Sequence, residues 1–129
     1  MEDLAGYSSR WRKPVTAFYK GYEIISMPPP SSGGIALLQL LKMTEQYNIG
    51  EMGFHSPQSM HLMIEAERRV YADRAEFLGD PDFVMTPVEG LLNSDYLRQR
   101  MSSFSLTSAT PSAEVTHGDP MPYESEETT

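Results

Sequence analysis

The pattern of apolar and polar positions divides the chain into a strand-rich start, three helical stretches and a polar tail. From Val15 to Met27, β-branched and aromatic residues favour extended structure, and Lys20-Gly21 fits a hairpin turn. Residues 35–47 are apolar on nearly all sides, which is typical of a buried helix. Because a chain of 129 residues has little with which to surround such a helix, we expect part of its partner surface to lie outside these residues.

The second helical stretch, predicted over 57–79, has the clearest boundaries. Ser56 is a good N-cap and Pro57 a good first helical residue, and Gly79 is predicted to end the helix in a left-handed conformation. One apolar stripe follows the helical period between them, formed by Met60, Met63, Ile64, Val70, Tyr71, Phe77 and Leu78.

Charged residues also occupy this helix. Glu67 and Arg74 interrupt the apolar stripe on its own face, and a charge there favours a structural ion pair of Arg74 with Glu67 or Asp80. Glu65 precedes Arg69 by four residues, a spacing worth a few tenths of a kcal/mol where it is exposed.

A third, shorter helix is predicted over about 94–104, capped by Asn93 or Ser94. From residue 105 the periodicity ends, Ser, Thr, Pro and Gly dominate, and five acidic residues occur without Lys or Arg. Such a composition predicts a flexible segment over 105–129 when it is considered alone.

A proline-rich run, SMPPPSSGG at 26–34, joins the strand region to the first helix. Its prolines exclude a helix and a central strand, because proline lacks an N–H and fixes φ. The serines and glycines leave the first helical turn nearly free of side chains, so another backbone or an anion can approach it closely. A rigid loop packed against a neighbouring element is the simpler interpretation.

Composition and scattered charges exclude several function classes. A net charge of −8 argues against nucleic acid and anionic membranes, and no apolar run approaches the ~20 residues of a membrane span. Without cysteine there is no thiolate site, and no secretion-signal pattern follows Met1.

The basic patch at 10–13 favours a solvated approach to the strand over a phosphate site. The aspartates that could suggest a metal site lack the spacing of a calcium loop: Asp73, Asp80 and Asp82. The histidines are too scattered in sequence for a metal cluster: His55, His61 and His117.

Several short motifs occur in one order: Gly21-Tyr22, the SMPPPSSGG run, Glu65-Ala66-Glu67-Arg68, Tyr71-Ala72-Asp73-Arg74, LGDPDFV at 78–84, and Pro122-Tyr123-Glu124-Ser125 before Thr128-Thr129. This series resembles γ-glutamyltransferases (γ-glutamyltranspeptidases, glutathione hydrolases). The likeness runs from about Leu4 to Thr129 and is to the C-terminal part of their large subunit, up to the self-cleavage junction.

The resemblance implies an α+β fold class: a fragment of the αββα sandwich of the N-terminal-nucleophile hydrolases, mainly helical with a short β-hairpin and a disordered acidic tail. Residues 1–104 would be the C-terminal portion of the large subunit. Residues 105–129 would be a flexible pre-cleavage tail ending at the processing junction.

The resemblance also implies a catalytic residue. In this family a precursor cuts itself before a threonine, whose hydroxyl becomes the nucleophile and whose freed α-amino group, with a pKa near ~8, serves as base. The matching nucleophile is Thr128, after cleavage of Glu127–Thr128. The reaction implied is γ-glutamyl transfer from glutathione or a similar donor to water, an amino acid or a peptide, without a metal or organic cofactor.

The chain also departs from the family pattern. The histidine expected after Thr129 is missing, and so is the small subunit with its oxyanion site and substrate clamps. None of Arg12, Arg68, Arg69 and Arg74 matches the family arginine that grips the substrate carboxylate. Because such groups supply much of the catalysis, we expect this chain alone to be inactive and to have the remainder of the large subunit and the small subunit as partners.

Two alternatives stay open. Cephalosporin acylases and poly-γ-glutamate-processing enzymes share the architecture, with specificity residues mainly outside this segment. The second alternative is a truncated, non-catalytic helical module that binds a complementary subunit. By resemblance, the parent enzyme is expected to be periplasmic or secreted.

Overall fold

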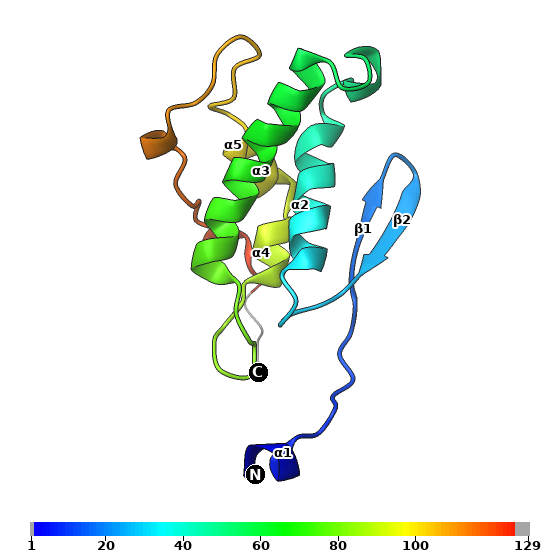
Figure 1. Cartoon of the computed structure of the whole chain (residues 1–129), viewed down its shortest axis with the longest axis vertical. Coiled ribbons are helices and arrows are strands. Elements are labelled where there is room, and N and C mark those ends of the chain that lie inside the picture. The colour runs from blue at the N-terminus through cyan, green and yellow to red at the C-terminus, as the bar shows by residue number, and fades with distance from the viewer. Residues whose placement is uncertain (1, 126–129) are drawn as a thin grey trace.

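The computed structural model describes residues 2–125 of the chain. It is mainly helical with one two-stranded sheet, which agrees with the predicted α+β class (Figure 1). The elements are α1 (Glu2–Gly6), β1 (Val15–Tyr19), β2 (Tyr22–Ser26), α2 (Gly33–Glu45), α3 (Pro57–Phe77), α4 (Val88–Leu92) and α5 (Ser94–Arg100), with 3₁₀ helices at Ile49–Glu51, Ser112–Glu114 and Met121–Tyr123.

The predicted hairpin is confirmed. β1 and β2 pair antiparallel, with Tyr19 opposite Tyr22. Lys20 and Gly21 both have positive φ, 48° and 84°, the combination that a two-residue hairpin turn requires. The hairpin is tied to α2, because the Lys42 ammonium donates to the Phe18 carbonyl at 3.1 Å.

The proline-rich run brings two backbones together at the start of α2. A Cβ atom added to Gly34 would lie 2.0 Å from the Met27 carbonyl oxygen, so no other residue fits there without a shift. The helix start that is free of side chains therefore receives a neighbouring backbone, one of the two approaches that the sequence predicts. The Pro29–Pro30 peptide bond is cis.

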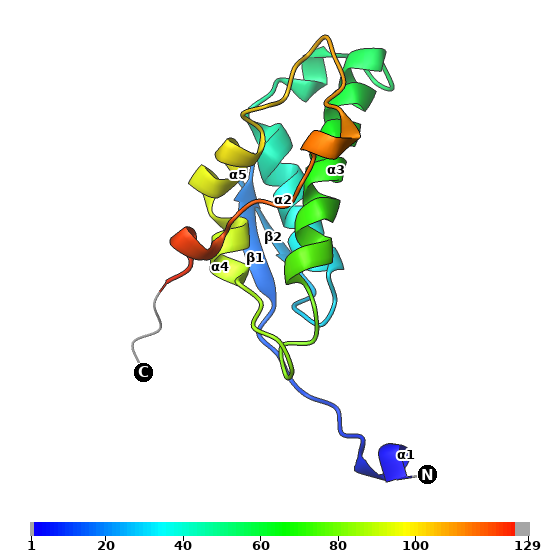
Figure 2. The ribbon, with the colours of Figure 1, turned by 90° about the vertical axis from the view of Figure 1, so that its left-hand side faces the viewer.

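α2 and α3 lie side by side, and α4 and α5 pack against α2 to complete one core (Figures 1 and 2). The buried apolar side chains are Val15, Ile35, Leu38, Met43, Leu62, Ala66, Val70, Leu91, Tyr96, Leu97 and Met101. Burial of α2 is one-sided, since Leu37 is 42% exposed.

The N-terminal boundary of α3 is confirmed and its C-terminal one is wrong. The Ser56 hydroxyl accepts from the Ser59 N–H at 3.1 Å, with Pro57 in the first turn. The helix ends at Phe77 because Leu78 turns to an extended conformation, φ −101°, so Gly79 does not act as a left-handed stop. Gly79 instead permits a close approach, since a Cβ there would lie 2.7 Å from Val84.

The third predicted helix begins as expected and ends early. The Asn93 side chain accepts from the N–H groups of Asp95 and Tyr96 at 2.9 and 3.3 Å, which confirms the cap. The helix α5 stops at Arg100 rather than near 104, and the short helix α4 before it was not predicted.

Residues 105–125 contain little regular structure, as their composition predicts, but they do not leave the body of the molecule. Figure 2 shows this segment running along α3 and reaching α4. Three sets of contacts, described below, hold it there. These contacts were not predicted, and the expected flexibility of 105–129 stays a prediction.

Candidate functional site

The face of α3 that lies against the C-terminal segment carries charged side chains spaced four residues apart. Glu65, Arg69 and Asp73 share this face because four residues make about one helical turn. All three are buried, with exposed fractions of 1%, 2% and 0%. Since a buried charge is costly unless it is paired, the partners of these groups define how the segment is held.

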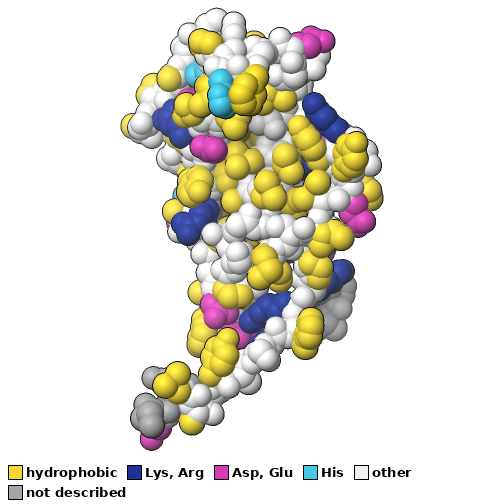
Figure 3. Space-filling view, turned by 45° about the vertical axis from the view of Figure 1, so that its right-hand side comes forward, with side chains coloured by type: hydrophobic (Ala, Val, Ile, Leu, Met, Phe, Trp, Pro, Cys, Tyr) yellow, Lys and Arg dark blue, Asp and Glu magenta, His cyan; other side chains and the backbone are white. Residues whose placement is uncertain are grey.

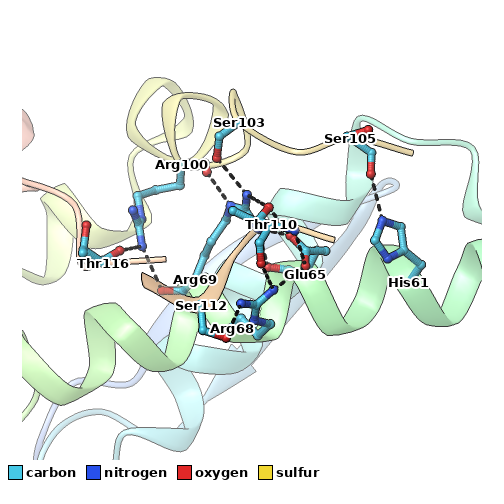
Figure 4. Close-up of polar contacts among 10 residues, drawn as sticks. All are labelled: His61, Glu65, Arg68, Arg69, Arg100, Ser103, Ser105, Thr110, Ser112 and Thr116. Atoms are coloured by element: carbon cyan, nitrogen blue, oxygen red, sulfur yellow. Dashed lines mark hydrogen bonds and ion pairs between the residues drawn. The ribbon is translucent and has the colours of Figure 1, made fainter. Parts of the chain in front are cut away.

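Glu65 is the centre of the first anchor, which we define as Glu65, Arg68, Arg69 and Thr110 (Figure 4). Its carboxylate accepts from Arg69 at 2.9 Å, from Arg68 at 2.6 Å and from the Thr110 hydroxyl at 2.5 Å. Arg69 also donates to the Arg100 carbonyl at 2.9 Å and to the Ser103 hydroxyl at 2.8 Å. The first anchor thus joins α3 to the chain on both sides of residue 105.

The electrostatics of the first anchor favour the ionised carboxylate. Burial by itself would raise the pKa of Glu65, but hydrogen bonds from Arg69, Thr110 and Arg68 outweigh it and lower the pKa to about 2. Glu65 is therefore a charged structural group at neutral pH.

Asp73 is the centre of the second anchor, which we define as Asp73, Tyr96, Arg100 and Gly118. Its carboxylate accepts from the Tyr96 hydroxyl at 2.8 Å and from the Gly118 N–H at 2.9 Å, and it pairs with Arg100 at 3.0 Å. Arg100 also donates to the Thr116 carbonyl at 2.7 Å. Burial, together with the charge of Asp73, raises the pKa of Tyr96, so its hydroxyl stays a donor.

The third anchor lies nearest to the predicted cleavage junction and is defined as Glu89, Gly90, Pro120, Glu124 and Ser125. The Glu124 carboxylate accepts from the Gly90 N–H at 2.7 Å, and the Ser125 hydroxyl donates to Glu89. A Cβ added to Gly90 would lie 2.3 Å from the Pro120 carbonyl oxygen. The backbone of the segment at Pro120 therefore lies directly against the backbone of α4 at Gly90.

The predicted nucleophile, Thr128, and the Glu127–Thr128 bond lie outside the described residues. Ser125 is the last described residue before them. Thr128 and its role stay predictions, and the three anchors are the part of this candidate site that the structure describes.

The family model for gamma-glutamyltranspeptidase matches residues 1–129. The chain belongs to the γ-glutamyltranspeptidase family. This membership confirms the family that the ordered motifs predict. The relatives in this family are enzymes.

Relatives and solved structures agree with the assignment. The glutathione hydrolase proenzyme of Escherichia coli (strain K12) is 45% identical over 128 residues, which are 99% of this chain and 22% of that protein. The acylase ACY 1 proenzyme of Pseudomonas sp. (strain SE83) is 42% identical over 107 residues, 83% of this chain and 19% of that protein. The crystal structure of Helicobacter pylori γ-glutamyltranspeptidase matches with a TM-score of 0.87 and 41% identity, over 99% of this chain and 36% of that chain.

The match to a γ-glutamyltranspeptidase structure confirms the predicted fold class. The chain spans only 22% of the length of the first of these curated relatives.

The ion pair predicted for Arg74 is wrong. Its guanidinium is exposed, donates to the Ser32 hydroxyl at 2.9 Å and lies 5.8 Å from the Tyr71 ring centroid. It pairs with neither Glu67 nor Asp80 among the contacts of residues 2–125. The sequence pattern misplaced the buried pairs because the stripe that Arg74 interrupts faces outward.

The other arginines and aspartates also pair structurally. Arg12 bridges Asp80 and Asp82 at 3.8 and 2.9 Å, and its hydrogen bond lowers the pKa of Asp82. Together with Arg10 and Trp11 they line a groove of about 690 Å³ beside the proline-rich run. Because these cations already have carboxylate partners, the groove offers a phosphate little net charge, in line with the preferred interpretation of the basic patch.

The histidines are dispersed. His61 contacts the Ser105 carbonyl at 2.8 Å, His117 lies edge-on against Phe77, and His55 stacks on Phe54. Over residues 2–125, no group of three or more His, Asp or Glu side chains is placed to hold a metal ion. Nor is any helix in that range long and apolar enough to cross a membrane.

Most of the apolar stripe predicted on α3 faces away from the core. Ile64 and Tyr71 are 48% and 58% exposed, and Met60 and Met63 are also exposed, whereas Val70 is buried. The helix α3 packs beside α2, and Arg74 on α3 donates to the hydroxyl of Ser32, the residue just before α2. Figure 3 shows hydrophobic side chains gathered across this side of the molecule. We call Leu37, Met60, Met63, Ile64 and Tyr71 the outer apolar face.

Proposed function

We propose that this chain is part of a γ-glutamyltransferase that cuts itself at Glu127–Thr128 and then uses Thr128 as nucleophile. One observation carries the proposal: the γ-glutamyltranspeptidase match extends over all 129 residues, including the Pro122-Tyr123-Glu124-Ser125 motif before the junction. The name of the Escherichia coli relative, a glutathione hydrolase proenzyme, supports a precursor that requires processing.

The proposed chemistry has two steps. The Thr128 hydroxyl attacks the γ-carbonyl of a donor such as glutathione, its proton passes by way of the freed α-amino group, and the amine half of the donor leaves. Water, an amino acid or a peptide then attacks the resulting ester and releases Thr128. By resemblance to the family, we assign the oxyanion donors for this step to the remainder of the parent protein.

The proposed partners are the remainder of the large subunit and the small subunit. The outer apolar face supports this assignment, because a patch of exposed apolar side chains on two adjacent helices marks an interaction surface. The length of the relatives supports it too, since this chain spans only 22% of the Escherichia coli protein. Export to the periplasm or the medium is proposed by family analogy alone.

The isolated chain is expected to be inactive. It should release no p-nitroaniline from γ-glutamyl-p-nitroanilide, because it lacks the proposed oxyanion and clamp residues. Turnover that disappears in a Thr128→Ala variant of the isolated chain would overturn this expectation.

An acylase is the second candidate function, favoured by the 42% identity to the acylase ACY 1 proenzyme. A panel of amide substrates on the parent protein separates the two: γ-glutamyl amides for the first, cephalosporin side-chain amides for the second. In either case Thr128→Ala should abolish turnover, while Thr107→Ala, an exposed threonine of the preceding loop, should not. Activity that survives Thr128→Ala would refute the proposed nucleophile.

A non-catalytic module is the remaining alternative. It predicts an isolated chain that is monomeric, melts cooperatively and binds no hydrophobic dye. The exposed outer apolar face favours a severed part of a larger core, which should bind such a dye or aggregate.

A further inference from the structure

We propose that the three anchors position the junction for self-cleavage, with Gly90, Glu124 and Gly118 as positioning residues. This inference rests on the proposed cleavage at Glu127–Thr128. It adds a role for residues other than the proposed nucleophile and base. The role follows from how the anchors are spaced, how closely they fit, and how near they come to the junction.

The anchors are spread along the whole described length of the segment. Thr110 is held by α3, Gly118 by Asp73 on the same helix, and Glu124 by the Gly90 N–H on α4. Each contact joins residues that are 34 or 45 positions apart in sequence, so each fixes a long-range position rather than a local turn. Three fixed points on one body define a single path for the segment.

Two glycines make this path a close fit. A Cβ on Gly118 would lie 2.6 Å from the Tyr96 hydroxyl and 2.7 Å from the Arg100 side chain. A Cβ on Gly90 would lie 2.3 Å from the Pro120 carbonyl oxygen and 3.2 Å from the Glu124 carboxylate. At Gly90 two backbones meet, whereas at Gly118 the backbone of the segment lies directly against the side chains of Tyr96 and Arg100.

The charges of the anchors also favour one register of the segment along the body. Glu65 and Asp73 are buried and fully partnered, and part of that partnering comes from the segment itself: the Thr110 hydroxyl and the Gly118 N–H. If the segment shifted by one residue, these carboxylates would lose donors in a buried site. Buried polar groups of this kind favour one register over its neighbours.

The third anchor limits the position of the junction because it lies so near to it in sequence. Ser125 bonds Glu89, and only one residue separates Ser125 from Glu127. Because a residue spans at most ~3.6 Å, an anchor at Ser125 restricts how far the Glu127–Thr128 bond can stray from α4. Attack of a hydroxyl on the preceding carbonyl needs a defined approach, and an error of about 1 Å can cost roughly 100-fold in rate.

Adding a methyl group at the Gly90 contact provides the test. In the full-length parent precursor, Gly90→Ala must move Pro120 by about 1 Å to restore an ordinary contact, from 2.3 Å to about 3.4 Å. We expect self-cleavage, followed by gel and intact mass, to slow about 10- to 100-fold. Gly50→Ala is the matched control, since a Cβ at Gly50 meets nothing within 4 Å.

A second pair of variants keeps the test decisive if Gly90→Ala fails to fold. Glu124→Ala removes the acceptor for the Gly90 N–H and should slow cleavage, whereas Glu124→Gln retains an acceptor oxygen and should restore most of the rate. In a double-mutant cycle Gly90→Ala and Glu124→Ala should be less than additive, because both break the same contact.

The outcomes separate the two levels of proposal. Cleavage by the Thr128→Ala precursor at Glu127–Thr128 would refute the proposed function. Normal cleavage at that bond in wild type, with wild-type rates in Gly90→Ala and Glu124→Ala, would overturn the positioning inference alone. Slow cleavage in Glu124→Ala without rescue by Glu124→Gln would also overturn it.

Discussion

Replacing Glu65 by glutamine tests the first anchor, because it removes one charge while keeping the size and shape of the side chain. The carboxylate binds two arginines and a threonine, and Glu65 itself is only 1% exposed. The Glu65→Gln change would leave both guanidinium groups without a carboxylate, and breaking a buried pair in this way costs about 3–5 kcal/mol.

The pKa of Glu65 gives an independent magnitude. Hydrogen bonds lower it from 4.5 to about 2, so the ionised carboxylate contributes about 3 kcal/mol of stability at pH 7. Because the folded-state pKa lies below the unfolded one, this contribution is complete above about pH 4.5 and disappears as the pH falls through 2. At pH 3 it should be about 1 kcal/mol.

Urea unfolding followed by circular dichroism at pH 7 and pH 3 measures the effect. We expect the free energy of unfolding to differ between wild type and Glu65→Gln by about 3 kcal/mol at pH 7 and by about 1 kcal/mol at pH 3. Glu67→Gln, an exposed position on the same helix, is the control and should stay within about 0.5 kcal/mol. A loss below about 1 kcal/mol at pH 7, or a loss equal at the two pH values, would refute the assignment of Glu65 as a charged anchor.

Three further predictions concern single contacts. Ser56→Ala should cost about 1 kcal/mol in urea unfolding by removing the N-cap of α3, with Ser102→Ala as an exposed control; equal stabilities would contradict the cap. Tyr96→Phe should cost about 1–3 kcal/mol, because Asp73 loses a buried donor, whereas Tyr22→Phe on the exposed hairpin should cost little. Ile64→Glu should reduce hydrophobic-dye fluorescence of the isolated chain while leaving its unfolding free energy within about 0.5 kcal/mol; unchanged dye binding would remove Ile64 from the outer apolar face.

Local signals in the sequence were sufficient for the hairpin turn and for the starts of two helices. The Ser56–Pro57 start of α3, the Asn93 cap of α5 and the Lys20-Gly21 turn are each set by one or two residues and their immediate neighbours. Gly79 was mistaken for a helix stop because glycine serves two purposes, positive φ and close approach, and only the contact with Val84 distinguishes them.

Burial was harder to predict, because it depends on which elements pack together. The stripe of Ile64 and Tyr71 has the period of a core face, yet it points outward in this chain. The buried face carries Glu65, Arg69 and Asp73. Their four-residue spacing places them on one face of the helix, but charged residues are not normally expected to be buried.

The candidate site was predictable only in part. Thr128 followed from the family resemblance, and no periodicity or spacing pointed to it. The anchors could not be found from composition, since Thr110 and Gly118 meet Glu65 and Asp73 across 45 residues of sequence. Considered alone, the segment is a polar tail, and its contacts become visible only once α3 is in place.

The most direct test of the account is N-terminal sequencing of the processed parent protein, together with intact masses of its pieces. We predict two polypeptides, one ending at Glu127 and the other beginning with Thr128-Thr129. A protein that stays in one piece while active, or that is cut at any other bond, would contradict the proposal that Thr128 is freed to act as the nucleophile.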